Sequence, residues 1–163
     1  MEGQVNMITL CVPSRGRPTL AKRFYDSVIA TCSDIKSVEV RFYLNEDDPS
    51  LNDYLKNISK ANIWVGPHQS TSFSWNRLAL RAKHDIVCLM GDDVQIKTKN
   101  WDQKIYAEFE NVNDKLLMVV PWTGRPRGYS DSQLELHGRY VCKKNEDLPS
   151  PHFAVHKKWI EVL

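Results

Sequence analysis

The chain has 163 residues, of which 22 are Lys or Arg and 20 are Asp or Glu, giving a formal net charge of +2. This length suits one domain, and the interspersed charges do not form the basic patch that is typical of nucleic-acid-binding proteins. No apolar run approaches membrane-spanning length, and the first residues lack the pattern of a signal peptide. The four cysteines are far apart and form no C-x-x-C pair, which favours reduced thiols. We therefore expect a soluble, cytoplasmic protein with a single domain, residues 1–163.

Strands and helices are predicted in alternation along the chain. Apolar runs such as residues 7–12 are typical of strands buried on both faces, whereas residues 38–44 alternate apolar and polar side chains. Between them, apolar side chains recur at helical spacing, first after Thr19. The predicted strands are residues 7–12, 38–44, 62–67, 86–90 and 116–122. The predicted helices are residues 19–28, 51–58, 72–85 and 101–112, and residues 152–163 form a strand-like piece and the start of a helix.

This alternation predicts an α/β fold, with a mostly parallel, Rossmann-like sheet covered by helices on both faces. In such sheets, ligands bind beyond the carboxyl ends of the strands. Four polar clusters stand at these ends, and we expect them to meet at one rim. They are "PSRGR" (13–17), "NEDD" (45–48), "GPHQSTS" (66–72) and "GDDV" (91–94).

Two further segments carry predictions about packing and movement. In the helix predicted at residues 72–85, the apolar side is expected to hold Phe73, Leu78, Ala79 and Ala82. From residue 121 to 151 the periodicity fails. A stretch of this length without regular structure is typical of a functional loop or of disorder, and a mobile lid is one interpretation.

The sequence Gly91-Asp92-Asp93 follows a predicted buried strand and has several interpretations. Gly and Asp are common in turns, so the simplest is a turn. Adjacent carboxylates at the tip of a buried strand repel each other unless a cation or hydrogen-bond donors neutralise them, which favours a hard divalent metal bound through oxygen. Gly-Asp-Asp hairpins also bind magnesium in RNA-directed polymerases, but this chain is too short for the other parts of such an enzyme.

Several motifs, taken in order, resemble one family. "ITLCVPSRGRPTLAKRFYDSV" is similar to the first strand, Pro-(Thr/Ser)-x-x-Arg-Pro loop and first helix of family-two-type glycosyltransferases of the GT-A fold. "SWNRLALRAKHDIVCLMGDDV" is similar to their Ala-Arg-Asn-x-(Gly/Ala) helix and Asp-x-Asp strand. The resemblance implies a metal-dependent, hexosyltransferase-like enzyme. It would use Mn²⁺ or Mg²⁺ to transfer a sugar from a UDP- or GDP-type donor to an acceptor that the sequence does not identify.

The resemblance also implies roles for residues in the first and second polar clusters. It assigns Pro13, Ser14 and Arg15 to the nucleoside, and Arg17 to the neighbourhood of the phosphates. In this family an acidic residue after the second strand accepts a hydrogen bond from the base. The candidates are Asn45, Glu46, Asp47 and Asp48, and the sequence does not choose among them.

A helix residue pair is assigned to the nucleotide in the same way. Asn76 and Arg77 resemble the Arg-Asn pair of the helix that closes over the nucleotide, although Trp75 stands where the family usually has Arg. The match is therefore displaced: the resemblance assigns Asn76 and Arg77 to nucleotide binding, and a solvated helix residue is the alternative for Arg77. We interpret Trp75 and Phe73 as core residues rather than as a platform for the base.

For the metal, the resemblance implies two carboxylates and a histidine. Met90 occupies the first acidic position of the family motif, so Asp92 becomes the primary carboxylate and Asp93 the second ligand. His152 corresponds to the histidine ligand of many relatives. Such a cation neutralises the charge that develops on the departing diphosphate.

No general base is assigned, because the chain ends where many relatives carry it. The alternative to an active transferase is therefore a non-catalytic nucleotide-sugar-binding module, or a partial subunit that needs a partner for the acceptor side. Nucleotidyltransferases and nucleotide oxidoreductases are less consistent with the sequence, since no Gly-rich phosphate loop follows any predicted strand.

Overall fold

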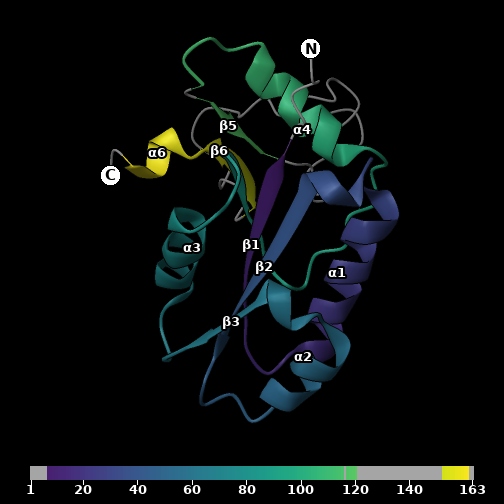
Figure 1. Cartoon of the computed structure of the whole chain (residues 1–163), viewed down its shortest axis with the longest axis vertical. Helices are drawn as coiled ribbons and strands as arrows, with labels where there is room; N and C mark the ends of the chain where they lie inside the picture. Colours follow the sequence, from purple (N-terminus) through teal and green to yellow (C-terminus); the bar gives the residue numbers. More distant parts are fainter. Residues whose placement is uncertain (1–6, 116, 121–151, 162–163) are drawn as a thin grey trace, which may run out of the picture.

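A single mixed sheet organises the computed structural model, which describes residues 7–115, 117–120 and 152–161 (Figure 1). Its strand order is β3-β2-β1-β4-β6-β5. The first four strands in this order are parallel to one another, whereas β6 runs antiparallel to both β4 and β5. The strands are β1 (Ile8–Ser14), β2 (Val38–Asn45), β3 (Ile63–Gly66), β4 (Ile86–Leu89), β5 (Met118–Val119) and β6 (Phe153–His156). The predicted mostly parallel α/β sheet is confirmed.

Helices cover both faces of this sheet. One face carries α1 (Pro18–Thr31), α2 (Leu51–Asn57) and α4 (Trp101–Glu110), and the other carries α3 (Thr71–Leu80) and α6 (Lys158–Glu161) (Figure 1). Two short 3-10 helices, η1 (Ile35–Ser37) and η2 (Lys60–Asn62), precede β2 and β3. Within the described ranges, no helix is both long enough and apolar enough to cross a membrane.

The core is divided into two apolar layers by the central strands. In β1, Leu10 and Val12 pack with Phe24 of α1 in one layer, while Cys11 packs with Leu78 of α3 in the other. Successive strand residues point to opposite faces, so a strand between two layers of helices must be apolar throughout. The parallel arrangement of β1, β2 and β4 brings the loops that follow them to one edge of the sheet.

Three details differ from the sequence predictions. Helix α1 begins at Pro18 rather than at Thr19, because Pro is well suited to the first helical position. Phe73 is 44% exposed, since α3 buries the stripe that contains Ser74 and Leu78 instead. The fifth strand has two residues, and the predicted lid, residues 121–151, lies outside the described residues.

Candidate functional site

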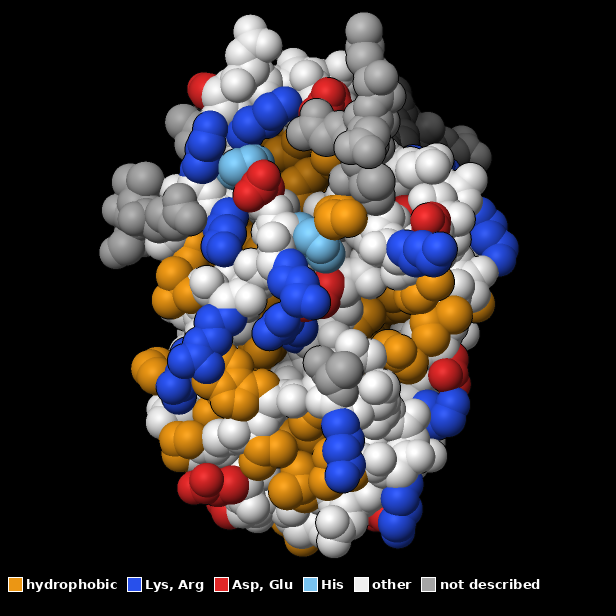
Figure 2. All heavy atoms as spheres, in the orientation of Figure 1, with side chains coloured by type: hydrophobic (Ala, Val, Ile, Leu, Met, Phe, Trp, Pro, Cys, Tyr) orange, Lys and Arg blue, Asp and Glu red, His pale blue; other side chains and the backbone are white. Residues whose placement is uncertain are grey.

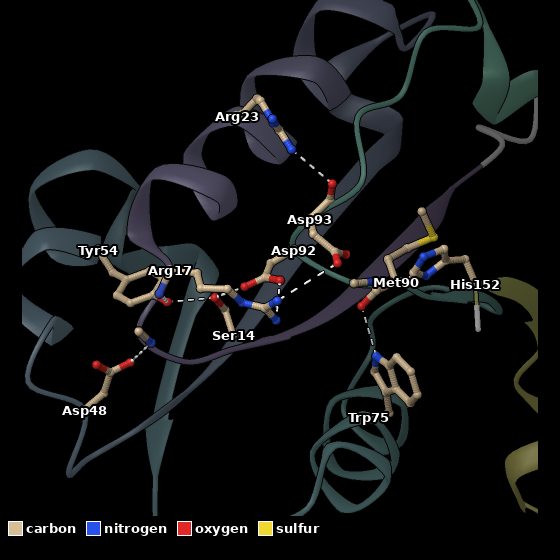
Figure 3. A network of polar contacts seen from close by, with 12 residues as sticks. Ser14, Arg17, Arg23, Asp48, Tyr54, Trp75, Met90, Asp92, Asp93 and His152 are labelled. Atoms are coloured by element: carbon tan, nitrogen blue, oxygen red, sulfur yellow. Dashed lines mark hydrogen bonds and ion pairs between the residues drawn. The ribbon is translucent and has the colours of Figure 1, made fainter. Parts of the chain in front are cut away.

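Polar side chains from three loops gather at the carboxyl ends of the parallel strands. Ser14 ends β1 and Arg17 lies in the loop that follows it, the loop after β2 supplies Asp48, and the loop after β4 supplies Asp92 and Asp93 (Figure 3). These loops belong to three of the four polar clusters in the sequence. The predicted meeting of the clusters at one rim therefore occurs for the loops after β1, β2 and β4.

Asp92 is the centre of this arrangement and its side chain is completely buried. The Ser14 hydroxyl donates a hydrogen bond to Asp92 Oδ2, and the Arg17 guanidinium lies 2.7 Å from Asp92 Oδ1. Oδ1 makes no hydrogen bond to the described residues and is held by the charge of Arg17. Burial raises the pKa of the Asp92 carboxyl, while the Ser14 hydrogen bond and the Arg17 charge oppose this rise.

Tyr54 connects the first loop to this carboxylate. Its hydroxyl lies 2.7 Å from Ser14 Oγ and accepts a 2.8 Å hydrogen bond from the Arg17 backbone N–H. Since the Ser14 hydrogen is directed to Asp92, the Tyr54 hydroxyl donates to Ser14. The result is a directed chain of hydrogen bonds from Arg17 N–H through two hydroxyls to Asp92, which fixes the loop backbone over the end of β1.

Asp48 and Asp47 have different surroundings, although they are adjacent in the acidic loop after β2. Asp48 is buried and accepts hydrogen bonds of 2.8 Å from the backbone N–H groups of both Gly16 and Ser50. Asp47 is exposed and forms a bidentate ion pair with Arg15, which lowers the pKa of the Asp47 carboxyl. Asp48 therefore braces the first loop from inside, whereas Asp47 joins the two loops at the surface.

The candidate residues of the acidic loop can now be compared. Glu46 is exposed, and Asn45 donates a hydrogen bond to the carbonyl of Pro67 at 3.3 Å. Asp48 uses both carboxylate oxygens within the protein. Contact of Glu46 or Asp47 with a base stays a prediction.

Asp93 lies at the edge of the buried site. Its side chain is 58% exposed, and Asp93 Oδ2 is 4.0 Å from the Arg17 guanidinium. The Asp93 backbone carbonyl accepts a hydrogen bond from Arg23 of α1 at 3.1 Å. The two adjacent carboxylates thus share one guanidinium, but one carboxylate is buried and fixed while the other faces solvent.

His152 reaches the same loop because β6 pairs with β4. Its Nδ1 accepts a 3.1 Å hydrogen bond from the Gly91 backbone N–H, and burial lowers the pKa of the imidazole. An accepting Nδ1 puts the proton of the neutral ring on Nε2. A Cβ on Gly91 would lie 2.7 Å from Asp93 Oδ1 and 3.0 Å from His152 Cε1, so an added methyl group there would push the Asp93 side chain aside.

The predicted pair Asn76 and Arg77 is not brought to Asp92. Asn76 is exposed on α3, and the Arg77 guanidinium lies over two aromatic rings, 4.9 Å from the centroid of Trp64 and 5.5 Å from that of Phe73. Figure 2 shows Lys and Arg side chains among apolar ones on the face of the molecule drawn there. A nucleotide role for Asn76 and Arg77 stays a prediction.

The site contains functional groups that sequence reasoning missed. Tyr54 occupies an apolar position of its helix, so no pattern indicated that its hydroxyl would join two loop residues. The Trp75 indole donates a 3.1 Å hydrogen bond to the Met90 carbonyl and so ties α3 to the end of β4. Trp75 also packs against the apolar layer on this face of the sheet, in agreement with its interpretation as a core residue.

The described residues do not form a metal site made by the protein alone. No three of their His, Cys, Asp and Glu side chains lie close enough together to hold an ion. Asp92 and Asp93 are two oxygen donors, which is the number that Mg²⁺ commonly takes from a protein when phosphates and waters complete its shell.

Comparisons with known proteins identify the fold as the GT-A type found in nucleotide-sugar glycosyltransferases. The mannosyltransferase PcManGT from Pyrobaculum calidifontis, in complex with GDP-Man and Mn²⁺, matches with a TM-score of 0.67 at 12% sequence identity. S. aureus TarS in complex with UDP matches with a TM-score of 0.67 at 13% identity. The two matches cover 95% and 96% of this chain, but only 46% of the PcManGT chain and 48% of the TarS chain.

A synthetase structure also matches. CMP:2-keto-3-deoxy-manno-octonic acid synthetase in complex with CTP has a TM-score of 0.57 at 12% identity, covering 95% of this chain and 76% of its own. No protein-family model and no curated protein sequence matches the chain. At these identities the likeness establishes the fold alone.

Proposed function

We propose that this domain binds a nucleoside-diphosphate sugar at the rim around Asp92 and takes part in transferring its sugar. The observation that carries the proposal is the meeting of Ser14, Arg17, Asp92 and Asp93 beyond the ends of β1 and β4 (Figure 3). Ligands of parallel α/β sheets bind at this edge. The structural neighbours in complex with GDP-Man, UDP and UDP-GlcNAc support a nucleotide-sugar ligand.

A divalent cation, Mn²⁺ or Mg²⁺, fits the donor groups of this rim. Asp92 and Asp93 would hold it, and Asp92 Oδ1 is a buried acceptor without a hydrogen bond in the described part of the chain. The cation would arrive with the diphosphate, because two carboxylates leave most of its shell to phosphate and water oxygens. When bound, it supplies positive charge for the departing diphosphate.

Each residue of the rim would contribute in a way that its surroundings suggest. Ser14 fixes the orientation of the Asp92 carboxylate, and Arg17 offers a cation to the phosphates. Arg15 and Asp47 join the first two loops on the side proposed for the nucleoside. His152 could ligate through Nε2 only after that nitrogen loses its proton, so we propose it as an additional ligand rather than an obligatory one.

Nucleotide binding in the presence and absence of metal tests the proposal. Wild-type protein would be titrated with GDP, UDP and CDP, with Mn²⁺ or with chelator, and followed by calorimetry and thermal unfolding. At a ligand concentration of about 100 times Kd, binding stabilises the folded state by about 2.7 kcal/mol. We expect one diphosphate to bind in a metal-dependent manner, and no response to any of them would refute the proposal.

Two variants make the test specific for the rim. Asp92→Asn removes the buried carboxylate and should abolish the effect of metal on nucleotide binding. Asp26→Asn is the matched control, since it removes the same charge from an exposed pair with Lys22 on α1. Equal effects of the two substitutions would show that the site lies elsewhere.

A non-catalytic binding module is the second candidate function. The chain spans less than half of PcManGT and of TarS, so the activity of those whole proteins does not carry over to it and binding alone has to be tested separately. GDP-mannose and UDP-N-acetylglucosamine distinguish the two candidates. Release or transfer of the sugar indicates an enzyme, whereas metal-dependent binding without turnover indicates the module.

A further inference from the structure

We propose that Arg17 is the resident cation of the Asp92–Asp93 pair, and that a divalent cation arriving with a diphosphate replaces it and releases its guanidinium to the phosphates. This inference rests on the proposed function and adds an exchange of cations to it. It makes Arg17 a residue that couples metal binding to nucleotide binding, rather than a passive phosphate ligand.

The position of the guanidinium is the first support. It lies 2.7 Å from Asp92 Oδ1 and 4.0 Å from Asp93 Oδ2, and so stands between the two groups that would hold a metal (Figure 3). The described residues place no other Lys or Arg within 4.0 Å of either carboxylate. Arg23 contacts only the backbone carbonyl of Asp93. A metal that uses Asp92 Oδ1 must therefore displace Arg17.

The difference in burial shows which partner can move. The Asp92 side chain has no exposure and is also held by Ser14, so its place is fixed. The Arg17 side chain is 50% exposed, although its backbone N–H is anchored to Tyr54. The Arg17 backbone is fixed, but its long side chain is partly exposed to solvent. The guanidinium can therefore move from Asp92 to a phosphate without a change in the loop backbone.

The balance of charge predicts coupling between metal and diphosphate. With Arg17 in place, two carboxylates face one positive charge. A divalent cation neutralises both carboxylates, but it leaves the displaced guanidinium without an anion and next to a second positive charge. A diphosphate supplies that anion, so each ligand should favour binding of the other, and by linkage the coupling is reciprocal.

Binding of Mn²⁺ without nucleotide tests this exchange directly. Free Mn²⁺ would be measured by electron paramagnetic resonance at about pH 8, where Asp carboxylates are normally ionised. We expect Arg17→Met to bind Mn²⁺ at least about tenfold more tightly than wild type, because the competing cation is gone. Arg23→Met is the matched control, since it removes the same charge from the same edge without touching a carboxylate.

Addition of GDP or UDP completes the test. In wild type the diphosphate should tighten Mn²⁺ binding about tenfold, whereas in Arg17→Met this coupling should largely disappear. Equal Mn²⁺ affinity of Arg17→Met and Arg23→Met would overturn the inference, because it would show that only net charge matters. If Arg17→Met does not fold, as judged by circular dichroism, Arg17→Gln gives the same comparison with a polar side chain.

The result also separates this inference from the proposed function. Wild type that binds no nucleoside diphosphate refutes the proposed function, while the comparison of Arg17→Met with Arg23→Met still decides whether Arg17 competes with metal. Conversely, metal-dependent nucleotide binding that is the same in wild type and Arg17→Met supports the function and refutes the exchange.

Discussion

Gly66 ends β3 beside the ring of Tyr43, and an added methyl group there would meet that ring. A Cβ at Gly66 would lie 2.6 Å from the Tyr43 hydroxyl oxygen, 3.1 Å from Cζ and 3.3 Å from Cε2. Tyr43 is only 1% exposed and its hydroxyl donates to the Pro67 carbonyl at 2.8 Å, so the ring has no open space to enter. Overpacking of this kind costs about 2 kcal/mol, which we expect for Gly66→Ala.

The position of the clash predicts how a second substitution would act. Tyr43→Phe removes the atom in closest contact, at the expense of one hydrogen bond worth about 1 kcal/mol. The double variant should therefore lose about 1 kcal/mol less than the sum of the two single variants. Gly16→Ala is the matched control: Gly16 has a φ of +67° and open space at Cβ, so its strain of about 1 kcal/mol should simply add to that of Tyr43→Phe.

Urea unfolding of the wild type, the three single variants and the two double variants with Tyr43→Phe measures these free energies. In a domain of this size, 1 kcal/mol also shifts Tm by roughly 2–4 °C. Additive losses in Gly66→Ala and Tyr43→Phe, within about 0.3 kcal/mol, would refute the contact between the two positions. A coupling of the same size in the Gly16 control would show that Tyr43→Phe acts through the whole fold.

Other predictions concern the buried polar groups. Tyr54→Phe leaves the Arg17 backbone N–H without its partner and removes the hydrogen bond donated to Ser14. Urea unfolding should show a loss of about 2 kcal/mol, and unchanged stability would contradict the hydrogen-bond chain. Because burial raises the pKa of Asp92, the contribution of Asp92 to the free energy of unfolding should fall as the pH rises through that pKa. Asp92→Asn should not show this decrease. Unfolding of both proteins between about pH 3 and pH 7 checks the direction of the change. Asp102→Ala should cost roughly 3 kcal/mol, since this buried carboxylate accepts from Ser33 N–H at 2.9 Å and from two hydroxyls, and the exposed Asp53→Ala should cost under about 0.5 kcal/mol in the same assay.

The order of the elements and the rim could be predicted from the sequence because both follow from patterning. Continuous apolar runs indicate parallel strands, and parallel strands bring their following loops to one edge. The antiparallel insertion of β6 between β4 and β5 could not be predicted. The apolar pattern of a short strand does not indicate which strand it pairs with or in which direction it runs.

Within the site, residue types were easier to predict than contacts. The resemblance to the Asp-x-Asp motif implied that Asp92 is the primary carboxylate, and Asp92 is the buried carboxylate of the pair in the structure. The sequence did not indicate that Arg17 would be paired with Asp92, or that Asp48 rather than Asp47 would point inward. Similarly, Phe73 was predicted on the apolar side of its helix from its residue type, but Ser74 stands four residues before Leu78 and shares the buried face, while Phe73 is exposed.

The place of β6 in the sheet has a consequence for how the molecule forms. β5 precedes β6 in the chain, but its pairing with the sheet is made through β6 alone among the described strands. Contacts between β4 and β6 join residues that are far apart in sequence, and such contacts form slowly because a long loop must close first. His152 reaches Gly91 only when β6 has docked on β4, so the final shape of the loop after β4 depends on this long-range strand pairing.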